Sequence, residues 1–242
     1  MRPLWMIFFI ALVAPRPSLQ GQQLNTRSSF MLRSTVVTSS RVFNNPDAQD
    51  IVDRDHYEFV DNLLGGGLEY RLEFPHQNVL FTLSVEYTSR LLAVTRPFLT
   101  TGNQLVQLPV KQGVHFIPFE LGAGTEIPLA EDVLQLTMGG GFGIYYANRV
   151  YEISGLSMKS ESLPIGYGIH VESGLDYRIF ENMGLRWEMR FRDPEVINES
   201  KFDPNYITVA NNQISVGNIP SKSKINVHGV SFTLGVIVGF EK

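Results

Sequence analysis

Four residues of this sequence have the types that a hydrolase would use. His170 and Glu172 alternate with apolar residues in the segment 165–179, so they share one face of a predicted strand. Ser84 and Ser231 fall on the corresponding polar face of two other predicted strands and could oppose them. Serine, histidine and an acid together form a nucleophilic triad. No spacing marks these four residues as a set, so we predict that His170 joins a network of buried charges and assign no catalytic residue.

Many more charged residues occupy the same polar face. Buried charges must be paired or hydrated, and this set is nearly balanced in sign. The interior of a small barrel is largely filled by side chains, which predicts an ion-pair network that plugs the lumen. The alternative is a narrow or gated ion path along the same residues. The set comprises Glu69, Glu73, Glu86, Glu120, Glu126, Glu172, Asp176, Glu188, Arg71, Arg90, Arg178, Arg186, Arg190, Arg192 and His170.

The segment 227–240 shows most clearly which elements position these residues. From Val230 to Phe240 an apolar side chain occurs at every second position, and the intervening positions hold Ser, Thr, Gly and Ile. A strand has a side-chain period of two, so one face is apolar and the other small or polar. The apolar face runs for about 11 residues, which is the length that a tilted strand needs to cross a bilayer.

The same alternation recurs along the chain and predicts eight strands. The first has a weak pattern, and its prediction depends mainly on the even strand number of closed antiparallel barrels. Short and long connections alternate between the strands: 75–78, 129–132 and 181–184 are short, whereas 39–62, 91–114, 147–164 and 193–224 are long. The strands are predicted near 28–38, 63–74, 79–90, 115–127, 133–146, 165–179, 185–192 and 225–240.

This pattern predicts an all-β fold: an eight-stranded antiparallel transmembrane β-barrel, an up-and-down meander with short periplasmic turns and long extracellular loops. Within the last long loop, Tyr206–Val209 and Gln213–Val216 have β-propensity and are expected to extend the barrel above the membrane. A secreted lipocalin-like barrel would show the same alternation with the faces reversed. The Gly-rich polar face, the aromatic residues near strand ends and the long loops at one end favour the membrane arrangement.

Residues 1–21 have the layout of a secretory signal peptide, which leaves 22–242 as the barrel. Arg2 precedes the apolar run Leu4–Ala14, and prolines and small residues follow. The 242 residues include no cysteine, which excludes a lipoprotein anchor, a disulfide and a thiol nucleophile. With a formal charge of −4 and no basic stripe, we predict no binding of nucleic acid.

Motifs for cofactors and metals are missing from the sequence. The five histidines are scattered, and the two Gly-Gly-Gly runs lack the spacing of a dinucleotide-binding loop. A calcium site in the first long loop is a weak alternative, since such loops are usually acidic in any case. We therefore predict no cofactor and no metal. The loop residues concerned are Asp53, Asp55, Asp61 and Asn62.

The chain resembles the OmpA/OmpX-type eight-stranded outer-membrane barrels. The resemblance is carried by the signal peptide, by V-S-F-T-L-G-V-I-V-G-F at 230–240 and by T-M-G-G-G-F-G-I-Y-Y at 137–146. It implies a location in the cell outer membrane, contact with its lipid and lipopolysaccharide, and recognition by the barrel assembly machinery through the strand that ends at Phe240. Glu241 and Lys242 follow that aromatic residue, which departs from the family pattern.

The function predicted from these observations is that of a non-enzymatic integral outer-membrane protein. Its role would be structural or would involve a surface ligand that contacts the loops. The alternatives are a small or gated ion channel, a lipid-acting enzyme and the lipocalin-like binding protein.

Overall fold

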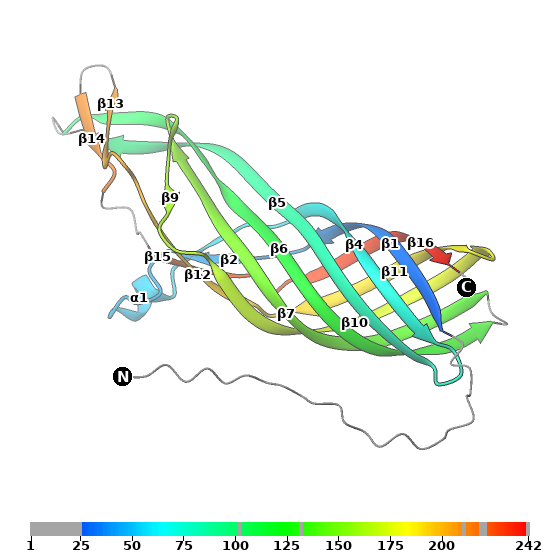
Figure 1. The fold of residues 1–242 in the computed structure, drawn as a ribbon. Helices are drawn as coiled ribbons and strands as arrows, with labels where there is room; N and C mark the ends of the chain where they lie inside the picture. The colour runs from blue at the N-terminus through cyan, green and yellow to red at the C-terminus, as the bar shows by residue number, and fades with distance from the viewer. Residues whose placement is uncertain (1–25, 101–102, 131–132, 210–211, 218–221, 241–242) are drawn as a thin grey trace, which may run out of the picture.

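The structure is a computed structural model that describes residues 26–100, 103–130, 133–209, 212–217 and 222–240. Eight antiparallel strands form a closed ring, in which β16 pairs with β1 and β10 pairs with β7 (Figure 1). The fold class predicted from the sequence is confirmed. The ring contains β1 (Arg27–Val37), β4 (Leu63–Phe74), β5 (Val79–Leu99), β6 (Leu105–Ala130), β7 (Leu134–Ile153), β10 (Ile165–Phe180), β11 (Met183–Arg192) and β16 (Val230–Phe240).

Three ring strands are much longer than predicted. The range 91–114, predicted as a loop, consists mostly of the paired ends of β5 and β6, with Leu91 opposite Gly113 and Leu99 opposite Leu105. Two prolines in this range suggest an interruption of the strands. Each lies, however, where the neighbouring strand on one side has already ended. Pro97 is on β5 beyond the last partner on β4, and Pro109 is on β6 beyond the end of β7. A missing backbone N–H breaks no ladder at such positions.

The predicted strand 225–240 is two strands, which corrects its boundary. β15 (Lys222–Asn226) leaves the ring and pairs with β12 and β2, and the barrel strand β16 begins at Val230. Gly229 lies at the break, where a Cβ atom would be 2.5 Å from the backbone N and O of Ser39. Only a glycine allows this close approach of two backbones.

The long connections at one end of the ring, here called the loop end, contain further short elements. Together with the ends of β5, β6 and β7 beyond the ring they form what we call the extension. β3, β2, β15, β12 and β9 form one sheet (Figure 1). The two segments of predicted β-propensity, 206–209 and 213–216, largely coincide with β13 and β14, which pair with each other. The added elements are β2 (Arg41–Phe43), α1 (Ile51–Arg54), β3 (Tyr57–Phe59), β8 (Leu156–Ser157), β9 (Lys159–Ser160), β12 (Glu195–Lys201), β13 (Tyr206–Val209) and β14 (Asn212–Ser215).

The faces of the ring are those of a membrane barrel and not of a lipocalin. On β11, Trp187 is 70% exposed on the outside, whereas its neighbour Arg186 is 0% exposed inside. Leu32 and Arg33 of β1 show the same contrast. An apolar exterior around a polar interior is unstable in water but suits a bilayer. None of the helices in the described ranges has the length and apolar character needed to cross a membrane.

The glycine runs allow the strands to approach closely, as their sequence context predicts. A Cβ atom on Gly141 of β7 would lie 2.0 Å from the backbone oxygen of Leu121, and one on Gly65 of β4 would lie 1.8 Å from that of Tyr87.

Residues 1–25, which include the predicted signal peptide, are outside the described ranges, as are the side chain of Phe240 and residues 241–242.

Candidate functional site: the charged lumen

The interior of the ring holds most of the charged residues predicted for it. Alternation explains their placement, since Arg186, Glu188, Arg190 and Arg192 occupy every second position of β11 and all point inward. Glu73, Glu172 and Arg178 are only partly buried, and Arg90 lies above the ring, in the extension. The buried members of the predicted set are Glu69, Glu86, Glu120, Glu126, Asp176, Glu188, Arg71, Arg186, Arg190, Arg192 and His170.

Arg190 is the centre of the network. Its guanidinium lies 2.5 Å from carboxylate oxygens of both Glu120 and Glu172, 2.9 Å from Glu188 and 3.1 Å from Glu69. One cation therefore joins acids from β4, β6, β10 and β11. Removal of that cation would leave several buried carboxylates without sufficient compensation.

Arg33 of β1 is a member that sequence reasoning missed. Its guanidinium nitrogens lie 2.7 Å from Glu69 and 2.7 Å from Glu86, and Thr35 donates a further hydrogen bond to Glu86. Phe30 and Leu32, two positions apart in β1, are exposed on the outside of the ring. The same period of two places Arg33 inside, so the signal was present in the sequence.

Arg192 ties the network to the closing strand. Its Nε donates to Glu120 at 2.7 Å, and Nη1 donates to Glu86 at 3.2 Å and to the hydroxyl of Ser231 on β16 at 3.1 Å. Because its partners lie on β5, β6 and β16, Arg192 links opposite walls of the ring.

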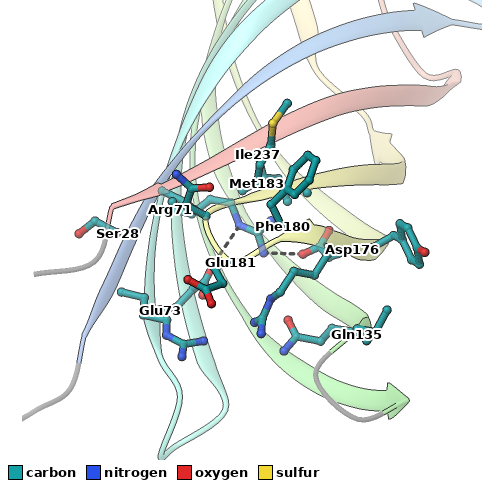
Figure 2. Close-up of a pocket in the computed structure, with 17 residues that line it drawn as sticks. Ser28, Arg71, Glu73, Gln135, Asp176, Phe180, Glu181, Met183 and Ile237 are labelled. Carbon is teal, nitrogen blue, oxygen red and sulfur yellow. Dashed lines mark hydrogen bonds and ion pairs between the residues drawn. The ribbon is translucent and has the colours of Figure 1, made fainter.

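The short-turn end of the lumen opens into a pocket of about 90 Å³ (Figure 2). Arg71 lies at its inner end, where Nη2 donates to Asp176 at 2.7 Å and to Glu126 at 3.3 Å. Glu73 and Glu181 also line the pocket, together with Arg27 and Arg178, so its wall carries both signs of charge. Arg186 then connects Asp176 to Glu188 at 2.8 Å each, which joins the pocket to the central network.

The residues of the possible hydrolase do not form a triad. His170 Nδ1 is 3.7 Å from Glu120 and Nε2 is 3.9 Å from Glu172. Among the described residues, each serine hydroxyl instead accepts a hydrogen bond from an arginine, Ser84 from Arg190 and Ser231 from Arg192. His170 therefore joins the network, as the favoured interpretation predicted.

An apolar layer closes the lumen at the loop end. Tyr145 donates its hydroxyl to Glu120 at 3.0 Å, and its ring stacks on Phe116 with centroids 5.8 Å apart and an angle of 4°. Side chains from the ring and from β2, β12 and β15 pack above this pair. We call this group the apolar lid: Val37, Val42, Val60, Leu63, Val114, Phe116, Tyr145, Ala147, Val196, Ile225 and Val227.

No cluster of histidine and acidic side chains suited to a metal ion occurs among the described residues. The ion pairs of Arg190 and Arg192 and the apolar layer above them together form a salt-bridged plug beneath an apolar lid.

No protein-family model and no curated protein sequence matches this chain. Among solved structures, it is similar to Ail, the attachment invasion locus protein of Yersinia pestis, with 16% identity over 89% of this chain and 99% of that one, and a TM-score of 0.46. Neisserial surface protein A matches at 10% identity over 88% and 97%, with a TM-score of 0.47. The outer membrane protease OmpT from Escherichia coli matches at 10% identity over 89% and 96%, with a TM-score of 0.43.

These neighbours differ in role, and the likeness assigns none of their roles to this chain. The resemblance to the OmpA/OmpX-type barrels stays a prediction, because no family model matches. The structure itself has the apolar exterior, polar interior and even number of antiparallel strands of an integral membrane barrel of the outer-membrane type.

Proposed function

We propose that this chain is a non-enzymatic integral protein of the outer membrane, whose sealed barrel carries the extension for contacts at the cell surface. The observation that carries the proposal is the double closure of the lumen. Arg190 and Arg192 connect walls on opposite sides of the ring, and the apolar lid lies directly above them. Side chains fill the interior of an eight-stranded barrel of this kind, so its lumen serves as a scaffold.

The proposed location in the outer membrane follows from the apolar exterior and polar interior of the ring. Export would use residues 1–21, assembly would use the strand that ends at Phe240, and lipid and lipopolysaccharide would surround the apolar exterior. The short turns would face the periplasm and the extension would face outward. Fractionation tests the location, and a folded barrel should migrate differently on a gel before and after boiling. Recovery of the protein in the soluble periplasm would contradict the proposal.

Conductance separates a sealed scaffold from the competing channel function. The channel is favoured by the excess of acids in the described lumen, where seven carboxylates face five buried arginines: Glu69, Glu86, Glu120, Glu126, Glu172, Asp176, Glu188, Arg33, Arg71, Arg186, Arg190 and Arg192. Recording from the refolded protein in planar bilayers should give no current steps across salts and voltages. Reproducible cation-selective steps would replace the scaffold with a channel.

The absence of an enzymatic role is part of the proposal and is tested through membrane lipids. Overexpression of the intact protein should leave the lipid profile unchanged, and a His170→Ala variant should give the same profile. A modified lipid that appears with the intact protein and disappears with His170→Ala would establish a lipid-acting enzyme.

A further inference from the structure

The extension contains a second group of charged residues, separate from the lumen network. Arg90 and Arg96 lie on β5 and Arg149 lies on β7, and Glu58 of β3 contacts Arg96 and Arg149. Arg90 is opposite Val114 on β6, which is in turn opposite Arg149, so these positions form a row across three strands. We call the three arginines the arginine cluster.

Among the described residues, Glu58 is the one carboxylate that contacts the arginine cluster, and it pairs with Arg96 and Arg149. Arg96 Nη2 donates to Glu58 Oε1 at 2.9 Å and to the side-chain oxygen of Gln112 at 2.7 Å. Arg149 Nη2 lies 3.7 Å from Glu58 Oε2, and its guanidinium lies 5.0 Å from the ring centroid of Tyr151. One acid therefore divides its two oxygens between two arginines.

Two donor atoms of the cluster are buried without a hydrogen-bond partner in the described structure. Arg149 is only 6% exposed, and its Nη1 is buried without a hydrogen-bond acceptor in the described structure. The Nε of the half-buried Arg90 is likewise buried without a hydrogen-bond acceptor within the described ranges. Burial lowers the pKa of Arg149 from its usual value, despite the opposing attraction of Glu58. A buried cation with unused donors is costly unless an acceptor reaches it.

We propose that the arginine cluster binds an oxyanion, a phosphate, sulfate or carboxylate group, on a solute that approaches from outside the cell. This inference deepens the proposed function and rests on its orientation of the extension. Arginine guanidinium groups present forked donors that match the oxygens of such groups. Glu58 is the internal occupant of the site, and the ligand displaces its carboxylate.

The position of the cluster favours a solute over a lipid headgroup. Arg96 and Arg149 face the interior side of β5 and β7, where Gln112 and Tyr151 contact them. The lipid-facing surface of the ring continues on the opposite, outward side of these strands. Glu58 is held by β3, a strand of three residues that pairs only with the three residues of β2 in the described structure. This short pairing makes its displacement feasible.

The test uses the full-length protein in phosphatidylcholine nanodiscs, with inorganic sulfate and inorganic phosphate as probes, and a parallel sample in nanodiscs that also contain the anionic lipid phosphatidylglycerol. Binding is followed by NMR of the arginine side-chain Nε–H signals. The direction in which one substitution changes the anion affinity distinguishes a binding site from a structural ion pair. Glu58→Gln removes the competing charge and should tighten anion binding about tenfold, the scale of one hydrogen bond to a charged group.

Two arginine substitutions complete the test. Arg149→Gln and, independently, the half-exposed Arg96→Gln should each abolish the gain when combined with Glu58→Gln. Glu195→Gln and Arg54→Gln, which change exposed charges elsewhere in the extension, are the matched controls and should leave binding unchanged. Gel mobility before and after boiling confirms that each variant is folded.

Three results would overturn the inference. Glu58→Gln could bind the anions no more tightly than the natural chain, the gain could persist without Arg96 and Arg149, or the same signals could respond only to anionic lipid in the disc and not to the soluble ions. A current through the unliganded protein would instead contradict the sealed barrel, so conductance recorded on the same preparation distinguishes failure of the proposed function from failure of the site.

Discussion

The ring and the extension are formed partly by the same strands, yet their polarity is opposite. Along β7, Phe142 is 60% exposed on the outside of the ring, opposite a Gly-rich interior. Further along the strand, Tyr151 and Ile153 are buried inside the extension, and Asn148 and Glu152 occupy the outward positions. The side-chain period of two continues without interruption, while the residue types on each face exchange.

The contrast shows that the surroundings, and not the sheet, decide which face is apolar. The ring excludes lipid from its charges, and the extension excludes water from an ordinary hydrophobic core. That core contains Leu108, Val110, Tyr151, Ile153, Phe202, Ile207, Ile214 and Val216. The transition lies at the apolar lid, where Phe116 and Tyr145 separate one regime from the other.

The largest effect is expected from removal of the central cation of the ring. Arg190→Met should lower the free energy of unfolding by about 3–5 kcal/mol, because acids that it pairs with stay buried. Urea titration of the protein refolded in vesicles, followed by tryptophan fluorescence, measures the change. Lys224→Met, at a partly exposed ion pair of the extension, is the control. An equal loss of unfolding free energy in both variants would show that the buried lumen network stabilises the protein no more than a surface pair does.

A cavity in the apolar lid should weaken the extension selectively. Ile225→Ala removes a side chain that is 0% exposed and should destabilise the lid by about 2–5 kcal/mol. Hydrogen exchange should increase in β2, β12 and β15, while β4 and β11 stay protected. Uniform loss of protection through the ring would show that the two regions unfold as one unit.

The same substitution on two exposed leucines tests the polarity contrast directly. Leu68→Arg, in the middle of the apolar exterior of β4, should cost about 2–4 kcal/mol, since a charge there enters the bilayer. Leu105→Arg, at the start of β6 in the extension, should change stability by less than about 0.5 kcal/mol. Equal costs would place both residues in the same medium.

The smallest effect is expected for an ion pair on the surface of the extension. Lys224 Nζ and Glu195 Oε1 are 3.1 Å apart, and the two side chains are 27% and 59% exposed. A double-mutant cycle with Lys224→Met and Glu195→Gln should give a coupling of at most about 1 kcal/mol, which falls further with added salt. A coupling comparable to that of the lumen pairs would contradict the contrast between buried and exposed charges.

Alternation was sufficient to predict the ring and most of its interior. The range 63–74 was predicted without error, and the inward positions of β11 follow directly from its sequence. Alternation could not reveal which charges pair, because Arg190 and Glu69 are far apart in sequence and meet only when the ring closes.

The extension could not be predicted from the alternation of apolar and polar residues. Pro97 and Pro109 signal breaks, and the sequence does not show that both stand at free edges. The arginine cluster was missed because Arg96, Arg149 and Glu58 fell in ranges predicted as loops or just beyond a strand. Arg90 was assigned to the lumen because nothing local marks the height at which the lid begins.

The paired ends of β5 and β6 also determine how far the hairpin tip stands from the membrane surface. From Leu91 to Leu99 the strand advances roughly 25 Å at about 3.3 Å per residue, compared with roughly 5–8 Å for the headgroup layer on one side of a bilayer. In the proposed orientation the tip of this hairpin projects well past the headgroups. A neighbouring cell or a large molecule that approaches the membrane would meet the hairpin tip before it could touch lipid.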